Sequence, residues 1–172
     1  MVVKAIDSME GKGIKIVIAI ARFIMAAQFL WAFFDKLFGL SHTTTPDKAW
    51  IRGGAPTAGF LGNAATGPLQ TIYNLIAGKA LTNWLFMLAL VLIGLALLIG
   101  AGMKVATISG SVLLFLQWSA ILPKPGNILQ IDEHVVYILV LLTLLFLKAG
   151  QIAGFGRWWA DTKLVKKLPG LE

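Results

Sequence analysis

The sequence predicts an all-α integral membrane protein: a bundle of four spanning helices with a long extracytoplasmic loop that contains short helices. The first observation behind this prediction is composition, because 58% of the 172 residues are hydrophobic, 13% are charged and the mean hydropathy is +0.80. Soluble domains average about 45–50% apolar and about 25% charged residues. The second is that apolar segments of spanning length recur four times in a chain long enough for one domain, residues 1–172.

The four spans are expected at about residues 14–40, 84–103, 105–122 and 134–155. Each approaches the roughly 20 residues that a helix needs to cross the hydrocarbon core. Lys104 separates the second span from the third, which predicts a tight helical hairpin. None of the segments alternates polar and apolar residues as a barrel strand does.

Lysine and arginine residues are distributed unevenly between the two sides of this arrangement. The side of both termini holds eight and the other side four, so the positive-inside rule predicts a multi-pass plasma-membrane protein with both termini in the cytoplasm. No basic stripe is interleaved with aromatic residues, so the net charge of +7 indicates contact with the lipid bilayer, not with nucleic acid. The eight are Lys4, Lys12, Lys15, Lys104, Arg157, Lys163, Lys166 and Lys167; the four are Lys48, Arg52, Lys79 and Lys124.

The loop at residues 41–81 is long for so small a protein, and long loops are often functional. Thr66-Gly67-Pro68 is typical of a helix start and Gly78 of a stop. Between them, apolar residues at helical spacing predict a short amphipathic helix over the bundle. Its apolar face comprises Leu69, Ile72, Tyr73 and Ile76.

Charged residues within or beside the spans are candidates for function, because a charge in hydrocarbon is costly unless it is paired or hydrated. Arg22 lies in the cytoplasmic half of the first span, where it can either extend to the headgroups or bind a ligand between the helices. Asp35 lies at the outer end of that span, where the helix dipole does not favour a carboxylate. The topology places Glu133 and His134 on the same side, so these groups are candidates for proton transfer. Helix capping alone remains the other reading of Glu133.

The loop motif WIRGGAPTAGFL at 50–61 is the most specific pattern. Arg52 beside Gly53 and Gly54 could bind an anion through a guanidinium fork and backbone N–H groups, and a tight structural turn is the alternative reading. Two histidines without tight ligand spacing predict no metal site. The chain has no cysteine and no flavin or nicotinamide fingerprint.

Several separated motifs together resemble the DoxX/DoxD family of small four-helix membrane proteins, over residues 22–159. They are FLWAFFDKLFGL at 29–40, the 50–61 motif, ATGP at 65–68, NWLFMLALVLIGLALLIGAGMK at 83–104, IDEHVVYILVLL at 131–142 and GRWW at 156–159. The resemblance is strongest to the DoxD branch, the small subunit of thiosulfate:quinone oxidoreductase. It implies oxidation of two thiosulfates to tetrathionate, with the electrons passed to a membrane quinone.

The resemblance also implies roles for the candidate residues. Thiosulfate would bind at Arg52, Gly53, Gly54, Lys48 and His42; quinone would bind at Arg22, Trp31, Phe34 and Trp118; and protons would pass through Asp35, Glu133 and His134. The expected cofactor is quinone, and the expected partner is a second small membrane subunit of the DoxA type, with homo-oligomerisation left open. A non-catalytic DoxX-type scaffold that recruits another protein, and a small carrier of lipid or solute, remain the alternatives.

Overall fold

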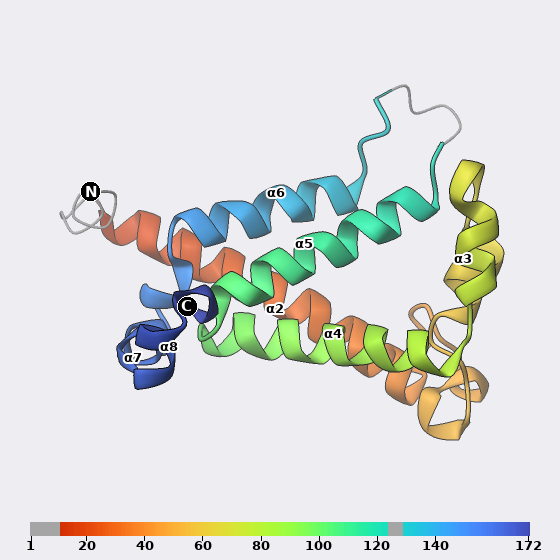
Figure 1. The fold of residues 1–172 in the computed structure, drawn as a ribbon, viewed down its shortest axis with the longest axis horizontal. Coiled ribbons are helices and arrows are strands. Elements are labelled where there is room, and N and C mark those ends of the chain that lie inside the picture. The colour runs from red at the N-terminus through yellow and green to blue at the C-terminus, as the bar shows by residue number, and fades with distance from the viewer. Residues whose placement is uncertain (1–10, 124–128) are drawn as a thin grey trace.

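The computed structural model describes residues 11–123 and 129–172, and these residues form helices and loops without a strand (Figure 1). The predicted all-α class is therefore confirmed for the described part of the chain. Lys4 and Lys124, which enter the charge comparison, lie outside the described residues. Four long helices form the body of the molecule: α2 (Gly11–Phe38), α4 (Ala80–Ile99), α5 (Met103–Ala120) and α6 (Glu133–Phe146).

The four helices pack as two main pairs, α2 with α4 and α5 with α6, and α4 also contacts α5. Buried apolar side chains from all four helices form one core, which includes Met25, Met87, Leu97, Leu114 and Leu141. Figure 1 shows α4 and α5 close together at their shared turn and apart at their opposite ends, where α3 (Gln70–Ile76) stands across the open side.

The turn between α4 and α5 differs from the prediction in its position. It lies at Gly100 and Gly102, which have φ angles of 80° and 68°, and Lys104 is already in the first turn of α5. Glycine adopts this left-handed conformation without the steric penalty of a Cβ, so it ends a helix where other residues would continue it. The second helix begins at Ala80, before the predicted position 84.

The fourth helix ends at Phe146, although the apolar run predicted a span to residue 155. Lys148 adopts a left-handed conformation with φ 49°, and the buried residues Ala149 and Gly150 turn the chain back against the end of α4. A Cβ on Gly150 would collide with the backbone of Gly100, so the turn depends on two glycines in contact. Short elements complete the chain: η5 (Ala149–Gln151), α7 (Gly156–Asp161), α8 (Lys163–Lys167) and η6 (Pro169–Leu171).

Arg22 holds this end of the molecule together. Its side chain is fully buried, and Nη1 donates to the carbonyl oxygens of Leu97 at 2.7 Å and Leu98 at 3.2 Å, while Nη2 donates to that of Ala153. The last carbonyls of a helix have no partner within the helix and carry the negative end of its dipole, so a guanidinium is well suited to them. One cation therefore joins α2 to the end of α4 and to the segment after α6.

The loop between α2 and α4 is ordered by buried polar contacts. Thr57 donates to Asn83 Oδ1 from its backbone N, at 3.1 Å, and from Oγ1, at 2.6 Å. Gly78 N donates to Thr57 Oγ1, and Asn83 Nδ2 donates to the Gly78 carbonyl. This closed network fixes the middle of the loop to the first turn of α4. The loop contains η1 (Pro46–Lys48), η2 (Trp50–Arg52), η3 (Phe60–Ala64), η4 (Gly67–Leu69) and α3.

The short helix predicted near the end of the loop is confirmed as α3, preceded by η4. Of its predicted apolar face only Tyr73 is buried, whereas Leu69, Ile72 and Ile76 are exposed. The Tyr73 hydroxyl lies 3.0 Å from the Leu116 carbonyl and 2.6 Å from Ser119 Oγ. The helix is therefore held against α5 by one tyrosine, and most of its apolar face is left uncovered by protein.

Candidate functional site

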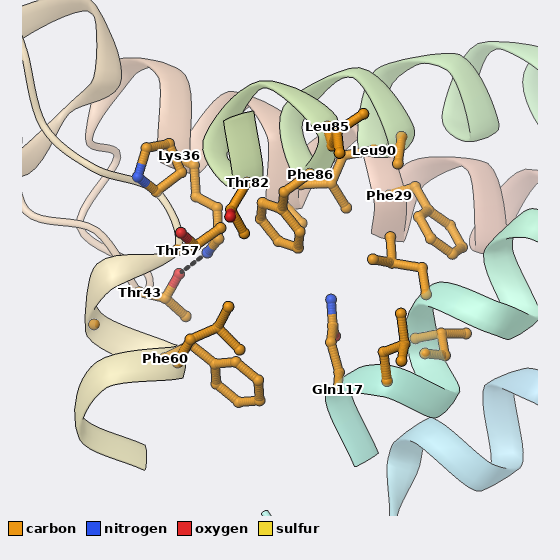
Figure 2. A pocket seen from close by; sticks show the side chains of 18 of the residues that line it. Phe29, Lys36, Thr43, Thr57, Phe60, Thr82, Leu85, Phe86, Leu90 and Gln117 are labelled. Carbon is orange, nitrogen blue, oxygen red and sulfur yellow. Dashed lines mark hydrogen bonds between the residues drawn. The ribbon is translucent and has the colours of Figure 1, made fainter. Parts of the chain in front are cut away.

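A cavity of about 860 Å³ occupies the space between the two helix pairs, on the side where α4 and α5 diverge. All four long helices contribute to its wall, and the loop closes it with residues of the 55–61 segment and of α3 (Figure 2). Most of the wall is apolar, with Phe29, Phe60, Phe86 and Leu90 among its side chains. Ligand sites in proteins are typically concave, largely apolar and about 300–1,000 Å³ in volume. This cavity has the size and character of such a site.

Lys36 places a cation at one end of this cavity. It lies two residues before the end of α2, and its Nζ donates to Thr43 Oγ1 at 3.1 Å. The ammonium also lies 5.9 Å from the centre of the Phe86 ring, within the range of a cation–π contact. Figure 2 shows the Lys36 side chain extending toward the threonines of the loop rather than away from the cavity.

Asp35 fixes the turn that carries Thr43. The fully buried carboxylate accepts hydrogen bonds from the backbone N of His42 and of Thr43, each at 3.0 Å, and from Thr43 Oγ1 at 2.7 Å. Because the single hydroxyl hydrogen of Thr43 is used by Asp35, the hydroxyl oxygen acts as the acceptor for Lys36. The carboxylate thus positions the turn and, through it, the ammonium.

The α6 side of the cavity carries other polar groups, including the predicted residues Glu133 and His134. Asp132 caps α6 by accepting from the backbone N of His134, and its second oxygen lies 3.0 Å from His134 Nδ1. Tyr137 lies one turn further along the helix, and Gln117 extends into the cavity from α5 (Figure 2). The structure therefore brings the histidine and acid to the same chamber as Lys36, although from a different helix.

Asp132, Glu133 and His134 also have potential metal-ligand atoms within 4.8 Å of one another. The three residues are consecutive, the Glu133 side chain is 63% exposed, and Asp132 is engaged in the helix cap. A carboxylate held against one imidazole nitrogen fixes the orientation of the ring. This arrangement suits a histidine that exchanges a proton with a bound molecule.

The glycine-rich loop places its backbone N–H groups differently from the prediction. Gly53 N donates to the Trp50 carbonyl and Gly54 N to the Ala49 carbonyl, each at 3.0 Å. Both N–H groups are thus satisfied inside the turn, as in the alternative reading of the motif. Gly53 has φ 87° and ends η2, which gives a local reason for glycine there.

The charged residues around this turn are exposed. Arg52 lies on the surface, whereas Lys48 contributes to the cavity wall. The Asp47 carboxyl has a pKa below its ordinary value, chiefly because the Thr45 side chain hydrogen-bonds to it and also because of the positive charges of Lys48 and Arg52. An ionised carboxylate therefore accompanies these two cations at the surface.

None of the four residues predicted to bind quinone lines the cavity. Arg22 lies near the middle of α2, against the last turn of α4, and Trp31 and Phe34 are on the exposed face of α2. Trp118 Nε1 donates to the Gln130 carbonyl at 2.8 Å. His42 also lies outside the cavity, with its ring 6.4 Å from that of Trp31.

The cavity residues that the sequence did not single out are mainly Lys36, Thr43 and Gln117. The available signal for Lys36 and Gln117 was a polar side chain within an otherwise apolar helix, the same signal that identified Asp35. No protein-family model matches the chain, and no curated protein or solved structure matches it significantly. The resemblance to the DoxX/DoxD family therefore stays a prediction from the motifs.

Proposed function

We propose that this chain is a four-span membrane protein whose cavity binds a lipid-soluble quinone. It would act as the DoxD-like subunit of a thiosulfate:quinone oxidoreductase. The observation that carries the proposal is the apolar cavity of about 860 Å³ with hydrogen-bonding groups at its ends. The motifs that resemble the DoxD branch supply the identity of the substrates.

The distribution of apolar side chains supports a membrane setting. Two helices, α2 and α4, are long and apolar enough to cross a bilayer, and α6 is apolar but has only 14 residues. All four long helices expose large apolar side chains to the surroundings, whereas monomeric soluble proteins rarely expose large continuous apolar patches. We therefore place all four in lipid. Examples are Ile16, Val17, Ile24, Leu92, Phe115 and Leu139.

The cavity suits a quinone in size and in polarity. An aromatic and aliphatic wall accommodates the ring and the start of an isoprenoid tail, and a few placed donors orient the carbonyl oxygens. Lys36 and Gln117 are donors that extend into the cavity, and His134 with Asp132 is placed to deliver a proton. These residues take the role that the sequence assigned to Arg22, Trp31, Phe34 and Trp118.

The proposed reaction joins two thiosulfate ions through a new S–S bond, which gives tetrathionate and releases two electrons. The quinone accepts both electrons and two protons and becomes the quinol. Glu133 and His134 line the cavity and are candidates to supply protons there. The second membrane subunit, of the DoxA type, would complete the path of the electrons from thiosulfate to quinone.

The test is thiosulfate-dependent quinone reduction in membranes that contain this chain with its partner subunit. Ala32→Phe adds a ring to the cavity wall and is expected to abolish most quinone reduction. Ala27→Phe is the matched control, because Ala27 is on the exposed face of the same helix and does not line the cavity. Equal rates for the two variants, both correctly folded, would disprove the cavity as the quinone site. No reduction by the unmodified chain with its partner would reject the oxidoreductase function and favour a scaffold.

A further inference from the structure

We infer that the Lys36 end of the cavity is an oxyanion-binding subsite, formed by Lys36 with Thr43 and supported by Lys48. The inference rests on the proposed function for its membrane setting, and it gives the anionic ligand of that function a place in the same chamber as the quinone. The ligand class is a sulfur or phosphorus oxyanion or a carboxylate. It can be a free ion, such as thiosulfate, or the head group of an amphiphile whose tail lies along the apolar wall.

The first argument is the unused hydrogen-bonding capacity of Lys36. An ammonium group has three donors, and among the described residues Nζ makes one hydrogen bond, to Thr43 Oγ1. The nearest carboxylate, Asp35, already accepts from two backbone N–H groups and one hydroxyl. The remaining donors of Lys36 are therefore available to a molecule in the cavity.

The second argument is preorganisation. The Thr43 hydroxyl donates to Asp35 and so accepts from Lys36, which holds the ammonium in one place before a ligand arrives. The Asp35 carboxylate is itself fully buried and held by the turn. A cation fixed in this way binds an anion without the loss of side-chain freedom that a mobile surface lysine would suffer.

The third argument is the presence of a second cation in the same wall. Lys48 lines the cavity and ends η1, and the preceding residues Thr45 and Pro46 pack closely against Gly39 at the end of α2. Each cation has an acidic neighbour, Asp35 beside Lys36 and Asp47 beside Lys48. Neither of these carboxylates lines the cavity, so the groups that this end presents to a ligand are positively charged and favour an anion. The carboxylate that lines the cavity, Glu133, belongs to α6 and not to the α2 end.

The glycine-rich loop is less suited to bind the anion than the Lys36 end of the cavity. The N–H groups of Gly53 and Gly54 donate to carbonyl oxygens within their own turn, and Arg52 is exposed and does not line the cavity. An exposed cation gains little from an anion in water, because solvent screens the interaction. The exposed Lys48 therefore contributes less to the subsite than the half-buried Lys36. Lys36 has the apolar surroundings in which such an interaction is stronger.

The test measures oxyanion binding to the full chain in nanodiscs of phosphatidylcholine, a lipid without net charge. Radiolabelled thiosulfate probes a free ion, and decyl sulfate with decanol as its uncharged counterpart probes an amphiphile. We expect Lys36→Met to weaken binding of the favoured oxyanion by about tenfold or more, and Lys36→Arg to retain most of it. Lys79→Met is the control, because Lys79 is exposed and does not line the cavity.

Unchanged binding by Lys36→Met, or binding of neither oxyanion by the unmodified chain, would overturn the subsite. If Lys36→Met does not fold, Thr43→Val decides the question, because it removes the hydroxyl that positions Lys36 but keeps the backbone N–H bound by Asp35. We expect about threefold weaker binding in that variant, and unchanged binding would likewise overturn the subsite. A parallel quinone titration separates the two proposals. Lys36-dependent oxyanion binding without quinone binding would uphold the subsite and reject the quinone site. Quinone binding without oxyanion binding would uphold the quinone site and reject the subsite.

Discussion

Arg22 and Lys36 lie on the same helix, about four turns apart, and their charges are used in opposite ways. The Arg22 guanidinium donates to three backbone carbonyls and is closed off from solvent. The Lys36 ammonium donates to one hydroxyl and faces a cavity. Arg22 uses both Nη atoms on the backbone and leaves only Nε without a partner, and it does not line the cavity, so its charge holds the fold together. Lys36 lines the cavity and has unused donors there, so its charge is available to a ligand.

The largest expected effect of this difference is on stability. Arg22→Met leaves the carbonyls of Leu97, Leu98 and Ala153 without their donor, and each lost partner of a buried polar group costs about 1–3 kcal/mol. We expect the free energy of unfolding to fall by about 3 kcal/mol or more, and by about 1 kcal/mol or less for Lys36→Met. Unfolding in a denaturing detergent titration measures both. Equal losses for the two variants would contradict the structural role of Arg22.

A second prediction concerns the glycines of the α4–α5 turn. Gly100 and Gly102 both have positive φ angles, but a Cβ on Gly100 would lie 2.6 Å from Arg22 Nη1, whereas one on Gly102 would meet open space. Both positions have a positive φ, so alanine carries a similar backbone penalty at each. The difference between the variants therefore reports the close contacts that only Gly100 has, with the guanidinium and with the Gly150 backbone. We expect Gly100→Ala to be less stable than Gly102→Ala by about 1–2 kcal/mol. Indistinguishable unfolding of the two would mean that Arg22 moves aside easily.

Much of the helical framework could be predicted from the sequence, because a long apolar run leaves a chain few alternatives to a helix. The positions at which α4 and α6 end were harder to predict. Glycines that read as ordinary members of an apolar run, Gly100 and Gly150, stop or reverse the chain because they pack against each other across the fold. The local sequence pattern does not reveal a contact between residues so far apart in the chain.

The candidate site was harder to predict for a related reason. The partners of Arg22 are 75 and 131 residues away in the sequence, so its role could not be told from that of a ligand-binding arginine. Trp31 and Phe34 were expected to face a ligand, but an apolar helix carries little information about which face is inside when lipid and core are equally apolar. Asp35, Glu133 and His134 were identified because a charge in such a segment needs a reason. The tertiary contacts, which the sequence does not show, place Asp35 in the turn at residues 42–43 and Glu133 and His134 in the cavity wall.

The third prediction tests the turn at the Lys36 end. Asp35→Asn replaces a carboxylate that accepts three hydrogen bonds by an amide with a single acceptor oxygen, so the backbone N–H groups of His42 and Thr43 lose part of their protection. We expect about tenfold faster amide exchange at these two positions, with the long helices unaffected, as measured by hydrogen–deuterium exchange. Asp47→Asn is the control, since Asp47 is exposed and outside this turn. Unaltered exchange in Asp35→Asn would show that the turn does not depend on the carboxylate.

The smallest expected effect is on the affinity of the cavity for quinone. Gln117 extends into the cavity and makes no side-chain hydrogen bond with the described residues, so its amide is free to bind a ligand carbonyl (Figure 2). Gln117→Leu keeps the volume of the side chain and removes one hydrogen bond, which corresponds to about 1 kcal/mol, or about fivefold in dissociation constant. Trp31→Leu changes an aromatic residue of the exposed face and is expected to leave the affinity unchanged. Quinone titrations of both variants would decide between the two surfaces of the bundle. Weaker binding by Trp31→Leu and unchanged binding by Gln117→Leu would move the ligand from the cavity to the outer face of α2.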